Sequence, residues 1–131
     1  MKLSEAIKLG SMLRPQGFGK GFDGTGTCAM GAADEAMGAT IDAKLGTMHS
    51  HGTNRPEWSW AKKGSSFGDV PCPVCRSIGS PASRISVHLN DEHRWTRERI
   101  ADWVATIEPQ EVLLLTHQPI VEEPQLVEVS R

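Results

Sequence analysis

The sequence predicts a small α+β domain of irregular build, with a few short helices and short strands arranged around one structural zinc ion. Cys72 and Cys75 are followed after twelve residues by His88 and His93, and C-x2-C-x12-H-x4-H is a spacing that a tetrahedral zinc site accepts. Apolar residues make up only 38% of the 131 residues and aromatic residues 5%, so the core is modest and a metal adds useful stability. All thirteen glycines lie between Gly10 and Gly79, which separates a loop-rich front from a more regular back.

We expect a single domain over residues 1–131. Its front, 1–70, is Gly-rich and made of helices and loops, 71–108 forms a zinc knuckle and a helix, and 109–131 is an extended acidic tail. The tail contains three prolines and several glutamates, with possible short strands at 111–115, 120–121 and 126–127.

Two short helices are expected in the front. The apolar spacing over Lys2 to Leu13 predicts an amphipathic helix that Pro15 stops. A glycine-rich loop, 16–26, precedes a second helix over Cys28 to Met37, with Thr27 as N-cap and Gly38 after its end. The second helix is rich in alanine, so it can pack closely against a neighbour.

The segment 39–71 is harder to assign. Thr40 to Met48 fits either a short helix or a strand, and the alternation of Trp58 and Trp60 favours a short extended segment.

The back half predicts a strand and then a helix. Polar and apolar residues alternate over Arg84 to His88, which favours a short strand, and Asn90-Asp91 is typical of a turn. Thr96 is the expected N-cap of a helix that runs to about Ile107. Trp95 and Ile100 have hydrophobic-staple spacing, and the expected buried stripe is Ile100, Trp103, Val104 and Ile107.

The predicted zinc ligands are Cys72, Cys75, His88 and His93. The Cys72-Pro73-Val74-Cys75 turn aims two thiolates at one point, and a closed site with four protein ligands is structural. The alternatives are two ordinary buried cysteines, or a ligand set that includes His49, His51 or Cys28.

The ligand spacing equals that of Cys2His2 zinc fingers, and Ile85 matches the finger's aliphatic position three residues before the first histidine. Two features differ: Gly79 stands at the finger's aromatic position, and Pro81 interrupts the segment before the histidines. Because the clear helix begins only after His93, we expect a knuckle followed by a loop, and not a finger that reads DNA.

Three other patterns suggest chemistry, and each has a plainer alternative. The 16–26 loop before a helix can cradle an anion, or be simply a flexible loop. Cys28 near a helix start can be a nucleophile or a buried thiol. The run from His88 to His93, with Asn90 and Asp91 inside it, invites comparison with HNH nucleases, although its residues lie too close together in the sequence.

Charge and cysteine content restrict the expected partners and compartment. The net charge is −2 and the isoelectric point about 6.2, so no overall charge favours nucleic acid or membrane. The arginines around the zinc ligands (Arg76, Arg84, Arg94, Arg97 and Arg99) suit either a nucleic-acid face or a solvated helix face of mixed charge. Three cysteines, a CxxC and no apolar run long enough for a membrane span or signal peptide favour the cytoplasm.

Two stretches resemble short proteins of bacterial and phage genomes. The first is MKLSEAIKLG through Arg14-Pro15-Gln16 together with TCAMGAA (27–33); the second is HLNDEHRWTRE (88–98) followed by IADW (100–103), placed after a CPxC. The resemblance covers about half of the chain and implies a phage or prophage setting and a zinc site, but no catalytic residue.

The sequence therefore favours a zinc-binding, non-enzymatic protein-interaction module with a viral or host protein as partner. A nucleic-acid-binding zinc module is the first alternative, and an HNH-like metal-dependent nuclease is the second.

Overall fold

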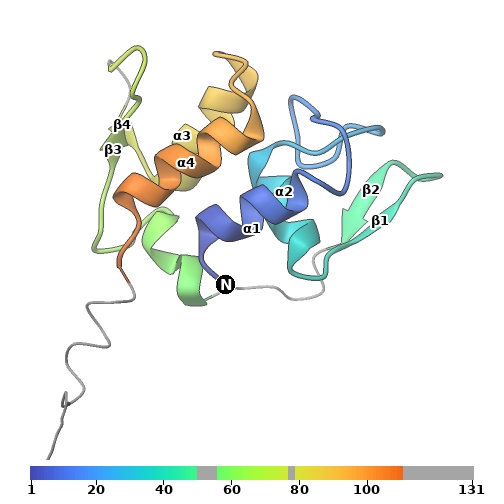
Figure 1. Ribbon diagram of the computed structural model, residues 1–131, viewed down its shortest axis with the longest axis horizontal. Helices are drawn as coiled ribbons and strands as arrows, with labels where there is room; N and C mark the ends of the chain where they lie inside the picture. The colour runs from blue at the N-terminus through green and yellow to red at the C-terminus, as the bar shows by residue number, and fades with distance from the viewer. Residues whose placement is uncertain (50–55, 77–78, 111–131) are drawn as a thin grey trace, which may run out of the picture.

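The computed structural model describes residues 1–49, 56–76 and 79–110, which contain short helices and two small antiparallel sheets (Figure 1). In chain order the elements are α1 (Leu3–Gly10), α2 (Ala29–Ala36), β1 (Thr40–Asp42), β2 (Thr47–His49), the 3-10 helix η1 (Pro56–Ala61), β3 (Val70–Pro71), β4 (Gly79–Ser80), α3 (Ala82–Asp91) and α4 (Arg97–Ile107). This is the small α+β domain that the sequence predicts. The strands expected at 111–115, 120–121 and 126–127 lie outside the described residues.

The helices form the centre of the molecule, and α1 lies between α2 and α4 (Figure 1). The two hairpins, β1–β2 and β3–β4, project from opposite sides of the helices (Figure 1). Every helix and η1 contribute to one buried cluster, whose largest members are Trp58, Leu3, Ile7, Ile85, Leu89, Ile100 and Val104. One continuous core therefore joins the front of the chain to the back.

Small residues let α1 and α2 approach closely, as the alanine content of α2 predicts. A Cβ atom on Gly10, at the end of α1, would lie 1.9 Å from the carbonyl oxygen of Ala32. A Cβ atom on Gly31 would lie 2.0 Å from the carbonyl oxygen of Gly21. Both contacts are with backbone that cannot move away easily, so glycine is required at both positions.

The far end of α4 caps the start of α1. The buried carboxylate of Glu108 accepts a hydrogen bond from the Ser4 backbone N–H at 3.2 Å and another from the Ser4 hydroxyl. A carboxylate at a helix N-terminus satisfies free N–H groups and interacts well with the helix dipole. The helix itself is shorter than the predicted span of Lys2 to Leu13, because residues 11–13 form turns after Gly10.

The N-cap predictions have different outcomes. Thr96 caps α4 as expected, its side chain accepting from the Arg99 N–H at 3.1 Å. At α2 the prediction of Thr27 is wrong by one residue, because the Cys28 sulfur accepts from the Gly31 N–H at 3.4 Å. Thr27 is instead fully buried, and its hydroxyl accepts a hydrogen bond from Arg97.

Two predicted extended segments are helical. Trp58 and Trp60 belong to η1, and they do not flank a strand. The span Arg84 to His88 belongs to α3, because its buried positions, Ala82, Ile85, Ser86, Leu89 and Asn90, follow the three-to-four spacing of a helix. The Asn90-Asp91 pair forms the last turn of this helix. By contrast, Thr40 to Met48 takes one of its two expected forms, the β1–β2 hairpin.

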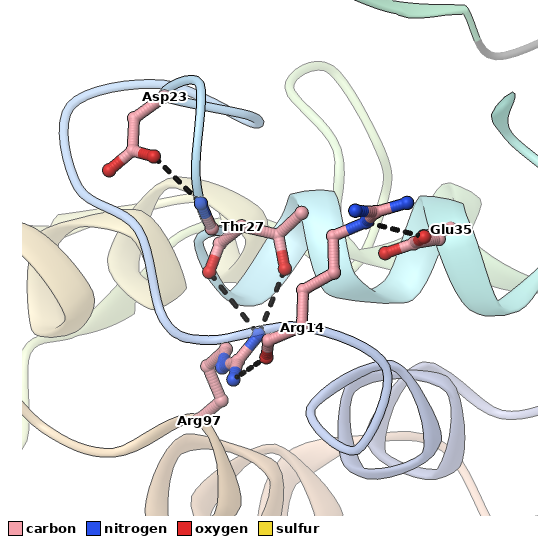
Figure 2. Close-up of polar contacts among 6 residues, drawn as sticks. Arg14, Asp23, Thr27, Glu35 and Arg97 are labelled. Atoms are coloured by element: carbon pink, nitrogen blue, oxygen red, sulfur yellow. Dashed lines mark hydrogen bonds and ion pairs between the residues drawn. The ribbon is translucent and has the colours of Figure 1, made fainter. Parts of the chain in front are cut away.

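Arg97 fixes the loop between α1 and α2, as Figure 2 shows. Arg97 is only 5% exposed. Within the described ranges it donates to neutral oxygens: the Thr27 hydroxyl at 2.9 Å, the Thr27 carbonyl at 3.4 Å, and the carbonyls of Arg14 and Ser11 at 2.6 and 3.1 Å. Burial lowers the pKa of Arg97 from its ordinary value, although arginine stays charged in proteins. The expectation that Arg97 belongs to an exposed basic face is therefore wrong.

The backbone N–H groups of the glycine-rich loop, residues 16–26, bind the carboxylate of a residue in the same loop, Asp23. The carboxylate of Asp23 accepts from the backbone N–H groups of Gly26, Thr25 and Phe18 at 2.8–3.1 Å, and Figure 2 draws one of these bonds. These bonds hold the pKa of Asp23 below its ordinary value, with the Gly26 bond contributing most. Because Asp23 occupies these amides, they do not form a cradle for an external anion.

Among the described residues, no helix combines the length and apolar character that a membrane span requires.

Replacing Arg97 by methionine should lower the free energy of unfolding by roughly 2–4 kcal/mol, because the oxygens of Thr27, Arg14 and Ser11 would lose charged donors while staying buried. Urea unfolding of the purified proteins measures this. Arg84→Met, which changes an exposed arginine on α3, is the matched control and should shift the value by less than about 0.5 kcal/mol. Equal effects of the two substitutions would contradict the assigned role of Arg97.

Candidate metal centre

The CxxC segment forms the turn side of the β3–β4 hairpin. Val70 pairs with Ser80 and Pro71 with Gly79, so Cys72 follows directly on the last residue of β3. Within the turn, the Cys72 sulfur accepts from the Val74 N–H at 3.4 Å, and the Cys72 carbonyl accepts from the Arg76 N–H at 3.0 Å. Arg76 has a φ of +58°, the left-handed conformation that lets the chain reverse here.

Helix α3 follows the hairpin and carries the histidines back to it. His88 is the seventh residue of α3, and His93 lies two residues beyond the helix end. After His93 the chain turns through Arg94, which has a φ of +56°, and the Trp95 N–H donates to the Leu89 carbonyl at 3.0 Å. This turn keeps His93 on the same side as His88. The site thus comprises a hairpin and a helix, whereas the sequence suggested a knuckle followed by a loop.

The four predicted ligands converge. One donor atom from each of Cys72, Cys75, His88 and His93 lies within 4.8 Å of all the others. The Cys75 sulfur is 3.6 Å from His88 Nε2, and the Nε2 atoms of His88 and His93 are 3.1 Å apart. With bonds of about 2.3 Å to sulfur and 2.0 Å to nitrogen, a tetrahedral zinc site has edges of about 3.5 Å between S and N and about 3.3 Å between the two N atoms. Both distances fit that shell closely.

The arrangement of the rings also suits a metal. The His88 and His93 rings meet edge to face, with centroids 4.7 Å apart and an interplanar angle of 87°. Two thiolates and two neutral imidazoles balance the charge of one divalent ion and fill four positions, so no coordination position is open to a substrate. These four donors can hold one metal ion.

The centre is joined to the core through its ligands. Cys72 is fully buried and belongs to the same cluster as Trp58, Ile85 and Leu89, whereas Cys75 is exposed. Ile85 lies one turn before His88 on α3 and is fully buried, as the aliphatic position of a zinc finger should be. An ion bound here would therefore tie the hairpin to α3 and to the core beneath it.

The competing ligand candidates lie elsewhere. His49 is exposed on β2, where its Nε2 atom is 3.4 Å from the Thr47 hydroxyl. Cys28 is 3% exposed at the start of α2, and burial raises the pKa of its thiol, which argues against a nucleophilic role. His51 lies outside the described residues.

The run His88 to His93 does not form an HNH-type arrangement in the described part of the chain. Both histidines face the cysteines. Asn90 is fully buried, and its side-chain amide donates to the Gly17 carbonyl at 2.9 Å and to Asp91 at 2.8 Å. Asn90 also accepts a hydrogen bond from Gln16 at 2.9 Å. Asn90 thus links α3 to the glycine-rich loop. The sequence does not predict this role, because the Asn90-Asp91 pair is typical of a turn.

Comparisons with protein-family models, with curated proteins and with solved structures find no match for this chain.

The ligand set predicts which histidine substitutions release the metal. His88→Ala and His93→Ala should each lower zinc content well below one ion per chain and broaden the thermal unfolding transition, because a structural ion contributes to folding. His49→Ala is the control and should retain one zinc. Elemental analysis of dialysed protein, with thermal unfolding beside it, measures both properties. Loss of zinc from His49→Ala with retention in His88→Ala would contradict the assignment.

The three thiols should also differ in reactivity. In zinc-loaded protein we expect slow labelling of all three by a maleimide, because two are metal-bound and Cys28 is buried with a raised pKa. After chelation, the exposed Cys75 should react first and Cys28 last. Peptide mass spectrometry over a labelling time course gives the order. Cys28 reacting before Cys75 would overturn this account of the three sites.

Proposed function

We propose that this chain is a small, zinc-stabilised, non-enzymatic protein-interaction module, encoded in a phage or prophage and acting in the cytoplasm of the host. The observation that carries the proposal is the closed donor set of Cys72, Cys75, His88 and His93. Such a site fixes a surface and leaves no position for a substrate, so binding is the activity it supports best.

The first alternative is a nucleic-acid-binding module. It is supported by the order of the elements, because a hairpin followed by a helix is also the order in a zinc finger. In fingers that read DNA, residues −1, 3 and 6 relative to the helix start contact bases. Counted from Ala82 in α3, these are Pro81, Arg84 and Val87. Proline and valine side chains offer no hydrogen bonds to base edges, and Pro81 is buried. The helix is therefore poorly suited to reading bases, which favours a protein partner.

The second alternative, a metal-dependent nuclease, requires an exchangeable ion with an open position. A nuclease would need His88 and His93 for catalysis and for an exchangeable ion, but both lie beside the cysteine sulfurs. Asn90 is engaged in structural hydrogen bonds. These contacts count against the nuclease.

The proposal is tested by capture from a bacterial host lysate with zinc-loaded protein, followed by reconstitution of the captured protein and sedimentation of the purified pair. We expect a stoichiometric protein complex that His93→Ala weakens. Fluorescence anisotropy with random 20-nucleotide single- and double-stranded DNA and RNA runs in parallel. Tight binding that falls steeply between 50 and 200 mM salt, or plasmid cleavage that requires added Mg²⁺, would contradict the proposal.

A further inference from the structure

A groove of about 720 Å³ lies along α3, between that helix, α2 and the segment that follows η1. Its apolar lining comes from Met30 of α2, Trp58 of η1 and Val87 of α3. The indole N–H of Trp58 donates to the Met1 carbonyl at 3.0 Å, so the only polar atom of its side chain is already satisfied. The volume is in the range of sites that enclose ligand groups, and an apolar lining suits apolar side chains.

Three cationic side chains line the same groove. Lys62, Lys63 and Arg84 are exposed, and none of their side chains makes a hydrogen bond or ion pair with the residues that the structure describes. Arg84 stands in the first turn of α3, and the two lysines come from the segment after η1. These three side chains are available to pair with carboxylates of a bound molecule.

Carboxylates line the groove as well, at the other end of the α3 wall. Asp91 and Glu92 lie at the end of α3, about 10–12 Å along the helix axis from Arg84. Asp91 is held in place by the Gly19 N–H at 3.1 Å and the Asn90 amide at 2.8 Å. Asp34 of α2 adds a third carboxylate to the lining. The groove therefore has both signs of charge, with opposite signs at the two ends of α3.

We infer that this groove docks an amphipathic peptide segment of a protein partner. The segment would place an apolar side chain against the partly exposed Met30 and Val87, carboxylates against the lysines and Arg84, and a lysine or arginine against Asp91 and Glu92. A phosphate backbone fits less well, because the carboxylates of the wall oppose its uniform negative charge. The inference rests on the proposed function and names the chemistry of its partner.

The groove and the metal centre share α3. His88, one of the four ligands, also lines the groove, so the ion that holds His88 to the hairpin fixes the position of the groove wall. Peptide binding should therefore require zinc, although no peptide atom needs to touch the ion.

The test selects binders from a yeast-displayed library of random twelve-residue peptides with the zinc-loaded full chain. We expect enriched peptides that carry an apolar residue between acidic and basic ones. The double variant Lys63→Glu with Arg84→Glu should bind them at least about tenfold more weakly, because attraction becomes repulsion at two positions. The matched control, Lys20→Glu with Lys44→Glu, reverses two exposed lysines that do not line the groove and should bind unchanged.

Val87→Asp provides a second variant, which places a charge in the apolar part of the groove and should also weaken binding about tenfold or more. Zinc content and thermal unfolding of each variant confirm that it is folded. Enriched peptides that bind these folded variants as tightly as the wild type would overturn the groove assignment and leave the proposed function standing. If no peptide is enriched while random oligonucleotides bind tightly, the proposed function fails together with the inference.

Discussion

The structure depends above all on the convergence of two thiols and two imidazoles from one stretch of the chain, residues 72–93. Hairpins as short as β3–β4, with two paired residues on each side, are not stable alone. Coordination of one ion by Cys72, Cys75, His88 and His93 would convert this weak hairpin and α3 into one rigid unit. Because Cys72 and Ile85 are also members of the core, the same ion would hold α3 in place against η1 and α4.

A second set of constraints organises the front of the chain around buried polar groups. Arg97 and Asn90, both from the back half, donate to backbone carbonyls between Ser11 and Thr27, and Glu108 caps α1. The glycine-rich front has little regular secondary structure, so few of its backbone groups are paired within helices or strands. These side-chain hydrogen bonds instead satisfy backbone groups that burial would otherwise leave unpaired. Helix α3 thus carries His88 of the candidate metal site and Asn90 of this polar set, so both sets of contacts involve this helix.

The parts that the sequence predicts well are those with local causes. The grouping of Cys72, Cys75, His88 and His93 follows from spacing and donor chemistry, and α4 follows from the Thr96 cap and its apolar residues. The prediction fails at Arg84 to His88, where five alternating residues imitate a strand. The helical spacing is hidden there because two of its buried positions are polar, Ser86 and Asn90. Arg97 is misread as a surface cation because its acceptors lie 70–86 positions earlier in the chain. The groove likewise combines three distant segments, and no local pattern predicts it.

X-ray absorption at the zinc edge identifies the atoms bound to the ion, and so tests whether Cys72, Cys75, His88 and His93 are its ligands. Zinc-loaded protein should give a first shell of two sulfur atoms at about 2.3 Å and two nitrogen atoms at about 2.0 Å, with the outer-shell signature of imidazole. A shell with no sulfur or a single sulfur, or one containing an exchangeable water in place of a histidine, would contradict the claim.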